Sequence, residues 1–133
     1  MKIVSLTLIG LLIGVFPAFG GEETPEEAVK IIFTLFKNKE FEQLIRERYT
    51  EIYKAEKAGK VADLIEDFSK RYANEEKLKN ITVFFESLLD IKPNIVMNSA
   101  PRVTETEKMA IFPLKDSEFK LYLQKSGKWG FHM

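Results

Sequence analysis

Cysteine is absent from this chain of 133 residues, and histidine occurs once, as His132. Without cysteine the chain forms no disulfide and carries no thiol nucleophile, no thiolate metal site and no lipid-modified cysteine. One histidine cannot supply the paired ligands of a histidine-rich metal site. We therefore predict no metal, no cofactor and no catalytic residue of these classes.

Glycine and net charge are also scarce. The chain has 7 glycines, and beyond residue 21 only Gly59, Gly127 and Gly130 are left, which form no phosphate-cradling loop. Lysine plus arginine (20) equals aspartate plus glutamate (20), so the formal net charge is +0. Because nucleic-acid binding needs a basic surface, we predict no nucleic-acid partner.

Residues 1–20 have the composition of a secretory signal peptide. Lys2 supplies a positive start, residues 3–16 are apolar, Pro17 breaks the run, and Ala18 and Gly20 are the small residues of a cleavage site. The apolar run is shorter than the ~20 residues that span a bilayer, so we expect no stable membrane anchor. The mature chain is predicted to begin at Gly21 and to be periplasmic or secreted, in a bacterium.

Four amphipathic helices are expected after the signal peptide. Thr24 and Glu27 form a capping box around Pro25, which suits the first helical position. Phe33 lies on the apolar stripe of this first helix and is expected, with Trp129, at the centre of the core. Apolar residues at helical spacing then predict helices over residues 41–59, 61–72 and 78–89, with ends near Gly59 and near residues 73–74.

The hydrophobic period changes from helical to alternating at Pro93. Strands are predicted over residues 95–98, 103–114, 118–125 and 128–133, with a bend at Pro101, a strand end at Pro113 and a tight turn at residues 115–117. Helices followed by an antiparallel meander indicate an α+β fold, with the helices packed on one face of the sheet. Residues 21–133 are expected to form a single domain.

The mature chain resembles the small exported members of the NTF2-like superfamily. The resemblance rests on the opening "TPEEAVKIIFTLFKNKEFEQL" and on the closing "KMAIFPLKDSEFKLYLQKSGKWGFHM". Residues 37–41 stand where these proteins have a Gly-Asp-Tyr-like joint, and residues 125–129 match their final hairpin. The resemblance implies a cystatin-like cone, in which a curved antiparallel sheet wraps the first helix around a cavity. The helical stretch of residues 41–90 is longer than in most such domains, which puts a roomy cavity in doubt.

Aromatic residues with a polar tip are the best candidates for a ligand site. Such side chains can both pack a cavity wall and form hydrogen bonds there. The candidate ligand-binding residues are Tyr49, Tyr53, Tyr122 and Trp129. Trp129 is expected first of all to anchor the sheet to the helices.

The sequence favours a non-catalytic domain that binds a small apolar ligand or a partner protein. One alternative is an enzyme of the isomerase or dehydratase type, which would need a buried carboxylate. Glu105 and Glu107 share a polar strand face, and Glu86 lies in an apolar stretch but is expected on the wet side of its helix. A second alternative is a subunit of an envelope complex that forms a homodimer through its sheet face.

Overall fold

The computed structural model describes residues 23–97 and 108–132. Five helices precede four strands in these ranges, which confirms the α+β class. The elements are α1 (Pro25–Lys37), α2 (Phe41–Arg48), α3 (Ile52–Ala58), α4 (Val61–Arg71), α5 (Glu75–Leu88), β1 (Asn94–Met97), β2 (Lys108–Pro113), β3 (Glu118–Leu123) and β4 (Trp129–Gly130). The predicted signal peptide, the bend at Pro101 and the pair Glu105 and Glu107 lie outside the described residues.

The predicted start of α1 is confirmed. The Thr24 hydroxyl accepts a hydrogen bond from the Glu27 amide at 3.1 Å, and the Glu27 carboxylate accepts one from the Thr24 amide at 2.8 Å. Two amide groups that the first helical turn leaves without partners are thereby satisfied. Two further helix boundaries are as predicted, since Gly59 ends α3 with φ 67° and Asn74 accepts a hydrogen bond from the Lys77 amide at the start of α5.

The helix predicted over residues 41–59 is broken in two. Tyr49 has an extended backbone between α2 and α3, and it forms a parallel bridge with Phe131. The Phe131 amide donates to the Arg48 carbonyl at 2.7 Å, and the Thr50 amide donates to the Phe131 carbonyl at 3.0 Å. These backbone bonds to the C-terminal segment replace the helical bonds and break the helix. The apolar stripe in the sequence runs on across the break, so hydrophobic spacing alone predicts one continuous helix.

The sheet is an antiparallel meander in the order β1-β2-β3-β4, as predicted. Pro113 is the last residue of β2, where its missing amide costs no ladder bond. The last strand is shorter than the predicted residues 128–133, because Phe131 turns to pair with Tyr49. Residues 103–107 of the second predicted strand lie outside the described residues.

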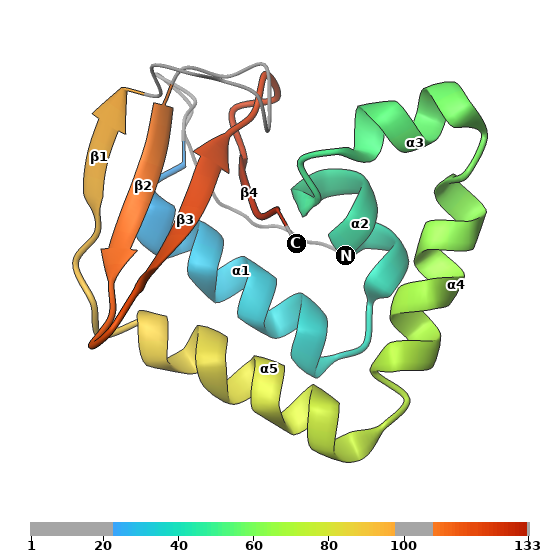
Figure 1. Cartoon of the computed structure of the whole chain (residues 1–133), viewed down its shortest axis with the longest axis horizontal. Helices are drawn as coiled ribbons and strands as arrows, with labels where there is room; N and C mark the ends of the chain where they lie inside the picture. Colours follow the sequence, from blue (N-terminus) through green and yellow to red (C-terminus); the bar gives the residue numbers. More distant parts are fainter. Residues whose placement is uncertain (1–22, 98–107, 133) are drawn as a thin grey trace, which may run out of the picture.

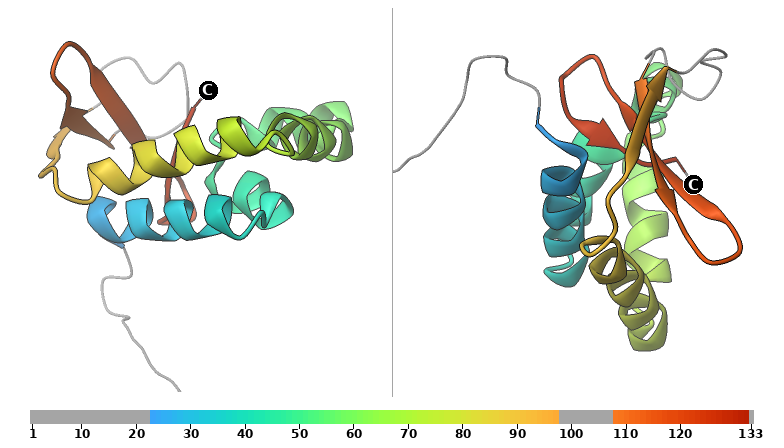
Figure 2. Two further views of the ribbon diagram at one scale, coloured as in Figure 1. Left: turned by 90° about the horizontal axis from the view of Figure 1, so that it is seen from below. Right: turned by 90° about the vertical axis from the view of Figure 1, so that its left-hand side faces the viewer.

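Helices α1 and α5 lie side by side and cover one face of the sheet, α2 lies next to β4, and α3 and α4 extend away from the sheet (Figures 1 and 2). Side chains of Ala110, Phe112 and Leu121 on the covered face are fully buried. Neighbouring positions point to the opposite face, which none of the described helices covers. This second face carries the partly buried Ile111 and Tyr122.

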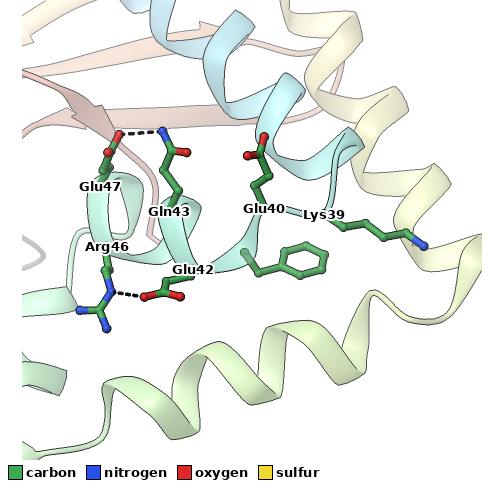
Figure 3. Close-up of a pocket in the computed structure, with 7 residues that line it drawn as sticks. Lys39, Glu40, Glu42, Gln43, Arg46 and Glu47 are labelled. Atoms are coloured by element: carbon green, nitrogen blue, oxygen red, sulfur yellow. Dashed lines mark hydrogen bonds and ion pairs between the residues drawn. The ribbon is translucent and has the colours of Figure 1, made fainter.

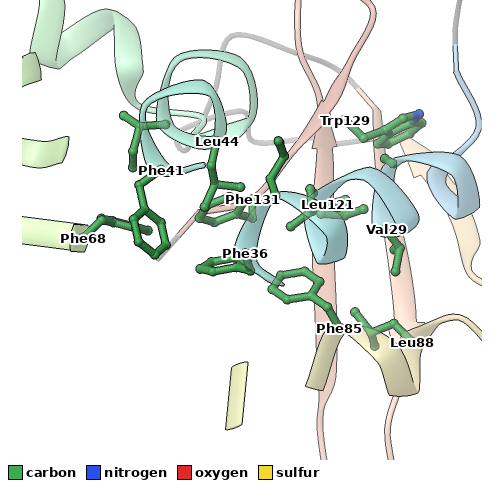
Figure 4. Packing of buried hydrophobic residues seen from close by; sticks show 14 of the residues in the cluster. Val29, Phe36, Phe41, Leu44, Phe68, Phe85, Leu88, Leu121, Trp129 and Phe131 are labelled. Atoms are coloured by element: carbon green, nitrogen blue, oxygen red, sulfur yellow. The ribbon is translucent and has the colours of Figure 1, made fainter. Parts of the chain in front are cut away.

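Aromatic rings fill the core, and Phe36 of α1 lies at its centre (Figure 4). Its ring centroid is 5.3 Å from that of Tyr72, 5.5 Å from that of Phe85 and 6.1 Å from that of Phe131. Rings from α1, α4, α5 and the C-terminal segment therefore meet in one cluster. Aromatic pairs at these separations add to the stabilisation that burial itself provides.

Trp129 is buried, as predicted, but the prediction that Phe33 is central is wrong. Phe33 is only partly buried, and the Lys37 ammonium group lies 5.7 Å from its ring centroid. The apolar stripe of α1 is so wide that its central line could not be located from spacing alone. The line runs through Ile32 and Phe36, and Phe33 lies at its margin.

We expect Phe36→Ala to lower the free energy of unfolding by about 3–5 kcal/mol, because it leaves a large cavity among packed rings. Phe33→Ala is the matched control, and its cost should be clearly smaller. Urea unfolding followed by circular dichroism measures both values. Equal losses for the two variants would contradict the central position of Phe36.

Gly130→Ala should destabilise the junction between α2 and the C-terminal segment. A Cβ atom at Gly130 would lie 2.6 Å from the Arg48 carbonyl oxygen, which is backbone and cannot rotate away. We expect a cost of about 1–3 kcal/mol and faster hydrogen exchange of the Phe131 amide. Gly59→Ala is the control for the exchange measurement: no atom lies within 4 Å of its Cβ position, so it strains only its own left-handed backbone, and Phe131 should stay protected. Unchanged exchange at Phe131 in Gly130→Ala would refute the close approach.

Candidate functional site

The four predicted ligand-binding aromatics do not line one cavity. Trp129 pairs with Leu123 on the helix-covered face of the sheet, whereas Tyr122 pairs with Gly130 on the opposite face. Tyr49 and Tyr53 lie near the break between α2 and α3, where the Tyr49 ring packs against Phe68. Contact of any of these residues with a ligand stays a prediction.

Tyr49 and Trp129 have structural partners. The Trp129 indole Nε1 donates a hydrogen bond to the Glu23 carbonyl at 2.9 Å. Burial raises the pKa of the Tyr49 hydroxyl, and the negative charge of Glu51 raises it further. Tyr49 therefore keeps its proton over the physiological pH range and has no phenolate character.

Two hollows lie on the helical part of the surface, and both are open to solvent. The larger one, of about 510 Å³, is at the turn between α1 and α2 (Figure 3). It is lined by Lys39, Glu40, Phe41, Glu42, Gln43, Arg46 and Glu47. Arg46 pairs along the helix with Glu42 at 3.1 Å, which is an exposed i,i+4 pair of small energetic value. A second hollow of about 320 Å³ lies beside Arg71, Tyr72 and Ile81. Neither has the enclosed apolar wall of a small-molecule pocket.

Acid–base and metal chemistry have little support among the described residues. Glu86 is exposed, as predicted from its place on α5. His132 is also exposed, and its Nδ1 lies 3.8 Å from a carboxylate oxygen of Glu51. Residues 23–97 and 108–132 contain no group of three or more His, Asp or Glu side chains that could hold a metal ion. In the same ranges, no helix is both long and apolar enough to span a membrane.

A buried ion pair joins Glu23 to Arg48, and the sequence reasoning missed it. Arg48 is 2% exposed and Glu23 is 16% exposed. The Arg48 guanidinium bonds both carboxylate oxygens of Glu23, with Nη2 donating to Oε1 at 3.1 Å and Nη1 bonded to Oε2. One signal could have revealed the arginine, because position 48 follows Leu44 and Ile45 on the apolar face of α2.

The ion pair also holds the start of β4. Arg48 Nη1 donates to the Trp129 carbonyl at 3.0 Å, and the Trp129 amide donates to Glu23 Oε2 at 2.9 Å. One network therefore joins Glu23, which precedes the cap of α1, to the end of α2 and to the last strand. The network ties three segments that are distant in sequence to one another, which indicates a structural role.

The most unusual surface is strand β1, at the outer edge of the sheet (Figure 1). All four of its residues are exposed, although three are apolar: Ile95 is 56% exposed, Val96 36% and Met97 61%. On one side β1 pairs with β2, and none of the described residues pairs with its other side. An exposed, uncharged apolar edge is a template for pairing with a further strand.

The opposite edge of the sheet is closed. Phe131, directly after β4, exchanges backbone hydrogen bonds with Arg48 and Thr50. The Gln124 side-chain amide adds bonds to the carbonyls of Glu47 at 2.8 Å and Lys128 at 3.2 Å. The segment between α2 and α3 therefore occupies the edge at which another strand would otherwise add.

Breaking the ion pair should cost more from the glutamate side than from the arginine side. Glu23→Gln leaves the buried Arg48 charge without a counter-charge, and we expect a loss of about 3–5 kcal/mol. Arg48→Met leaves Glu23, which solvent can reach, and fills the space, so a loss of about 1–3 kcal/mol is expected. Urea unfolding of both variants and of the double variant measures the coupling. A larger loss for Arg48→Met than for Glu23→Gln would contradict this assignment.

Comparison of the chain with family models, with curated proteins and with solved structures found no match.

Proposed function

We propose that this chain is an exported, non-catalytic domain that binds a partner protein through the edge strand β1. The observation that carries the proposal is the exposure of Ile95, Val96 and Met97 on an edge that no described residue covers. Burial of such side chains stabilises an association by about 25 cal/mol for each Å² of apolar surface removed from water. Addition of a strand to a sheet edge is a common mode of peptide and protein recognition.

A protein is favoured over a small apolar ligand because aromatic rings pack the interior formed by the described residues. The rings around Phe36 pack at centroid distances of 5.3 to 6.4 Å, and the two hollows described above are open. Of the four aromatics, Tyr122 lies on the uncovered sheet face, and it is the one best placed to join a protein interface. A small apolar ligand in an NTF2-like cone would instead need an enclosed cavity.

The enzyme alternative receives less support. An isomerase or dehydratase of this type would need a carboxylate held away from water. Glu86, which was the candidate, is exposed to solvent. The proposal includes a relationship to the NTF2-like superfamily. The order of the elements, with helices before an antiparallel meander, supports it. Export to a bacterial periplasm or beyond is supported by the composition of residues 1–20.

Site-specific photocrosslinking in the host tests the proposed function. A benzophenone amino acid at position 97 should give a protein adduct, because this side chain is 61% exposed on the binding edge. The same amino acid at position 83 is the control, since Val83 is 52% exposed but lies on α5 outside the sheet. Mass spectrometry identifies the adduct.

The outcomes separate the two partner classes. A protein adduct at position 97 that is absent at position 83 supports the proposal. No adduct at position 97, together with a bound small molecule in the native mass spectrum of protein purified from its host, would overturn it and favour the apolar ligand.

A further inference from the structure

We infer that the strand added at β1 is β1 of a second copy of this chain, paired antiparallel about a two-fold axis at Val96. The inference rests on the proposed function, since it names the partner of the same edge. Two four-stranded sheets joined in this way form one continuous sheet, with the helices of both copies on the same face.

The first step concerns charge. Strand β1 contains Asn94, Ile95, Val96 and Met97, and it has no charged residue, no proline and no bulge in its pairing with β2. These are the devices by which edge strands normally avoid other strands. An uncharged strand facing its own copy opposes no like charges, whereas a charged foreign strand would find no complementary charge on β1.

The second step concerns register. Residues directly opposite each other in an antiparallel pair point to the same face, so a two-fold axis must pass between two identical residues. An axis at Val96 places Ile95 opposite the partner's Met97 on the helix-covered side, and Val96 opposite the partner's Val96 on the other side. An axis at Ile95 would instead place Asn94 opposite the partner's Val96. The axis at Val96 is favoured because it pairs Ile95, Val96 and Met97 only with apolar residues.

The third step concerns the covered face. Ile95 lies opposite Ala110, which is fully buried, and Ala110 lies opposite the fully buried Leu121. The buried layer of the sheet therefore runs outward to Ile95 and ends there, in solvent. The partner's Met97 would extend this layer across the interface.

Sedimentation equilibrium of the full exported protein tests the inference. The wild-type protein should be a dimer. Val96→Lys and Val96→Glu should each raise the dissociation constant by about tenfold or more, because two like charges then face each other at the axis. An equimolar mixture of the two variants should restore the dimer, since lysine then faces glutamate. Val83→Lys is the control, with the same substitution at an exposed valine on α5, and should dimerise as the wild type does.

Rescue by mixing is diagnostic of Val96 as the residue at the axis, and circular dichroism of each variant shows that it is folded. Failure of the mixture to restore the dimer, or equal weakening by Val83→Lys, would overturn the inference. A monomeric wild-type protein whose adduct at position 97 is a different protein would refute self-pairing and leave the proposed function intact. An adduct with twice the mass of the chain at position 97 supports both.

Discussion

A buried guanidinium group sets the main constraint on this fold. Arg48 is 2% exposed, and a charge removed from water so completely destabilises the folded chain unless a counter-charge accompanies it. Glu23 is the only described residue that forms an ion pair with it, and it lies before the first helix. The chain must therefore bring its N-terminal segment back to the end of α2. Trp129 completes the network through its backbone and its indole, so the last strand is positioned by the same charge pair.

Much of the remaining architecture follows from this network. Helix α2 stops at Arg48 because the next backbone groups bond to Phe131 and no longer to the helix. The small Gly130 allows the two segments to approach, since a side chain there would collide with the Arg48 carbonyl. One edge of the sheet is thereby closed, while the rings around Phe36 fill the space between the helices and the sheet. Both effects leave β1 as the edge of the sheet that no described residue covers.

Local signals predicted a large share of the fold. The capping box at Thr24, the left-handed Gly59, the cap at Asn74 and the meander after Pro93 are encoded by neighbouring residues, and the structure has each of them. Bonds between residues about 80 positions apart cause the break at Tyr49 and shorten β4. Hydrophobic spacing carries no information about such distant partners.

The candidate site was harder to predict than the fold. The stretch from Ile95 to Met97 predicts a strand but not its exposure, because apolar composition is the same whether a strand lies in the middle of a sheet or at its edge. Only the pairing order decides this, and it places β1 outermost. The chemistry of an aromatic residue makes it a candidate for a ligand site, but the face to which Tyr122 or Trp129 points follows from register. An alternating pattern specifies register only when one face is clearly polar.

The unequal edges of the sheet also limit how large an assembly can become. A chain with two open edges can add neighbours at both sides without end, which is how sheets grow into fibres. Here a strand added at β1 uses the open edge, and the far side of each chain ends at β4 beside residues 48–50. A strand paired with β1 would therefore end the growth of the sheet, and the assembly would stay finite.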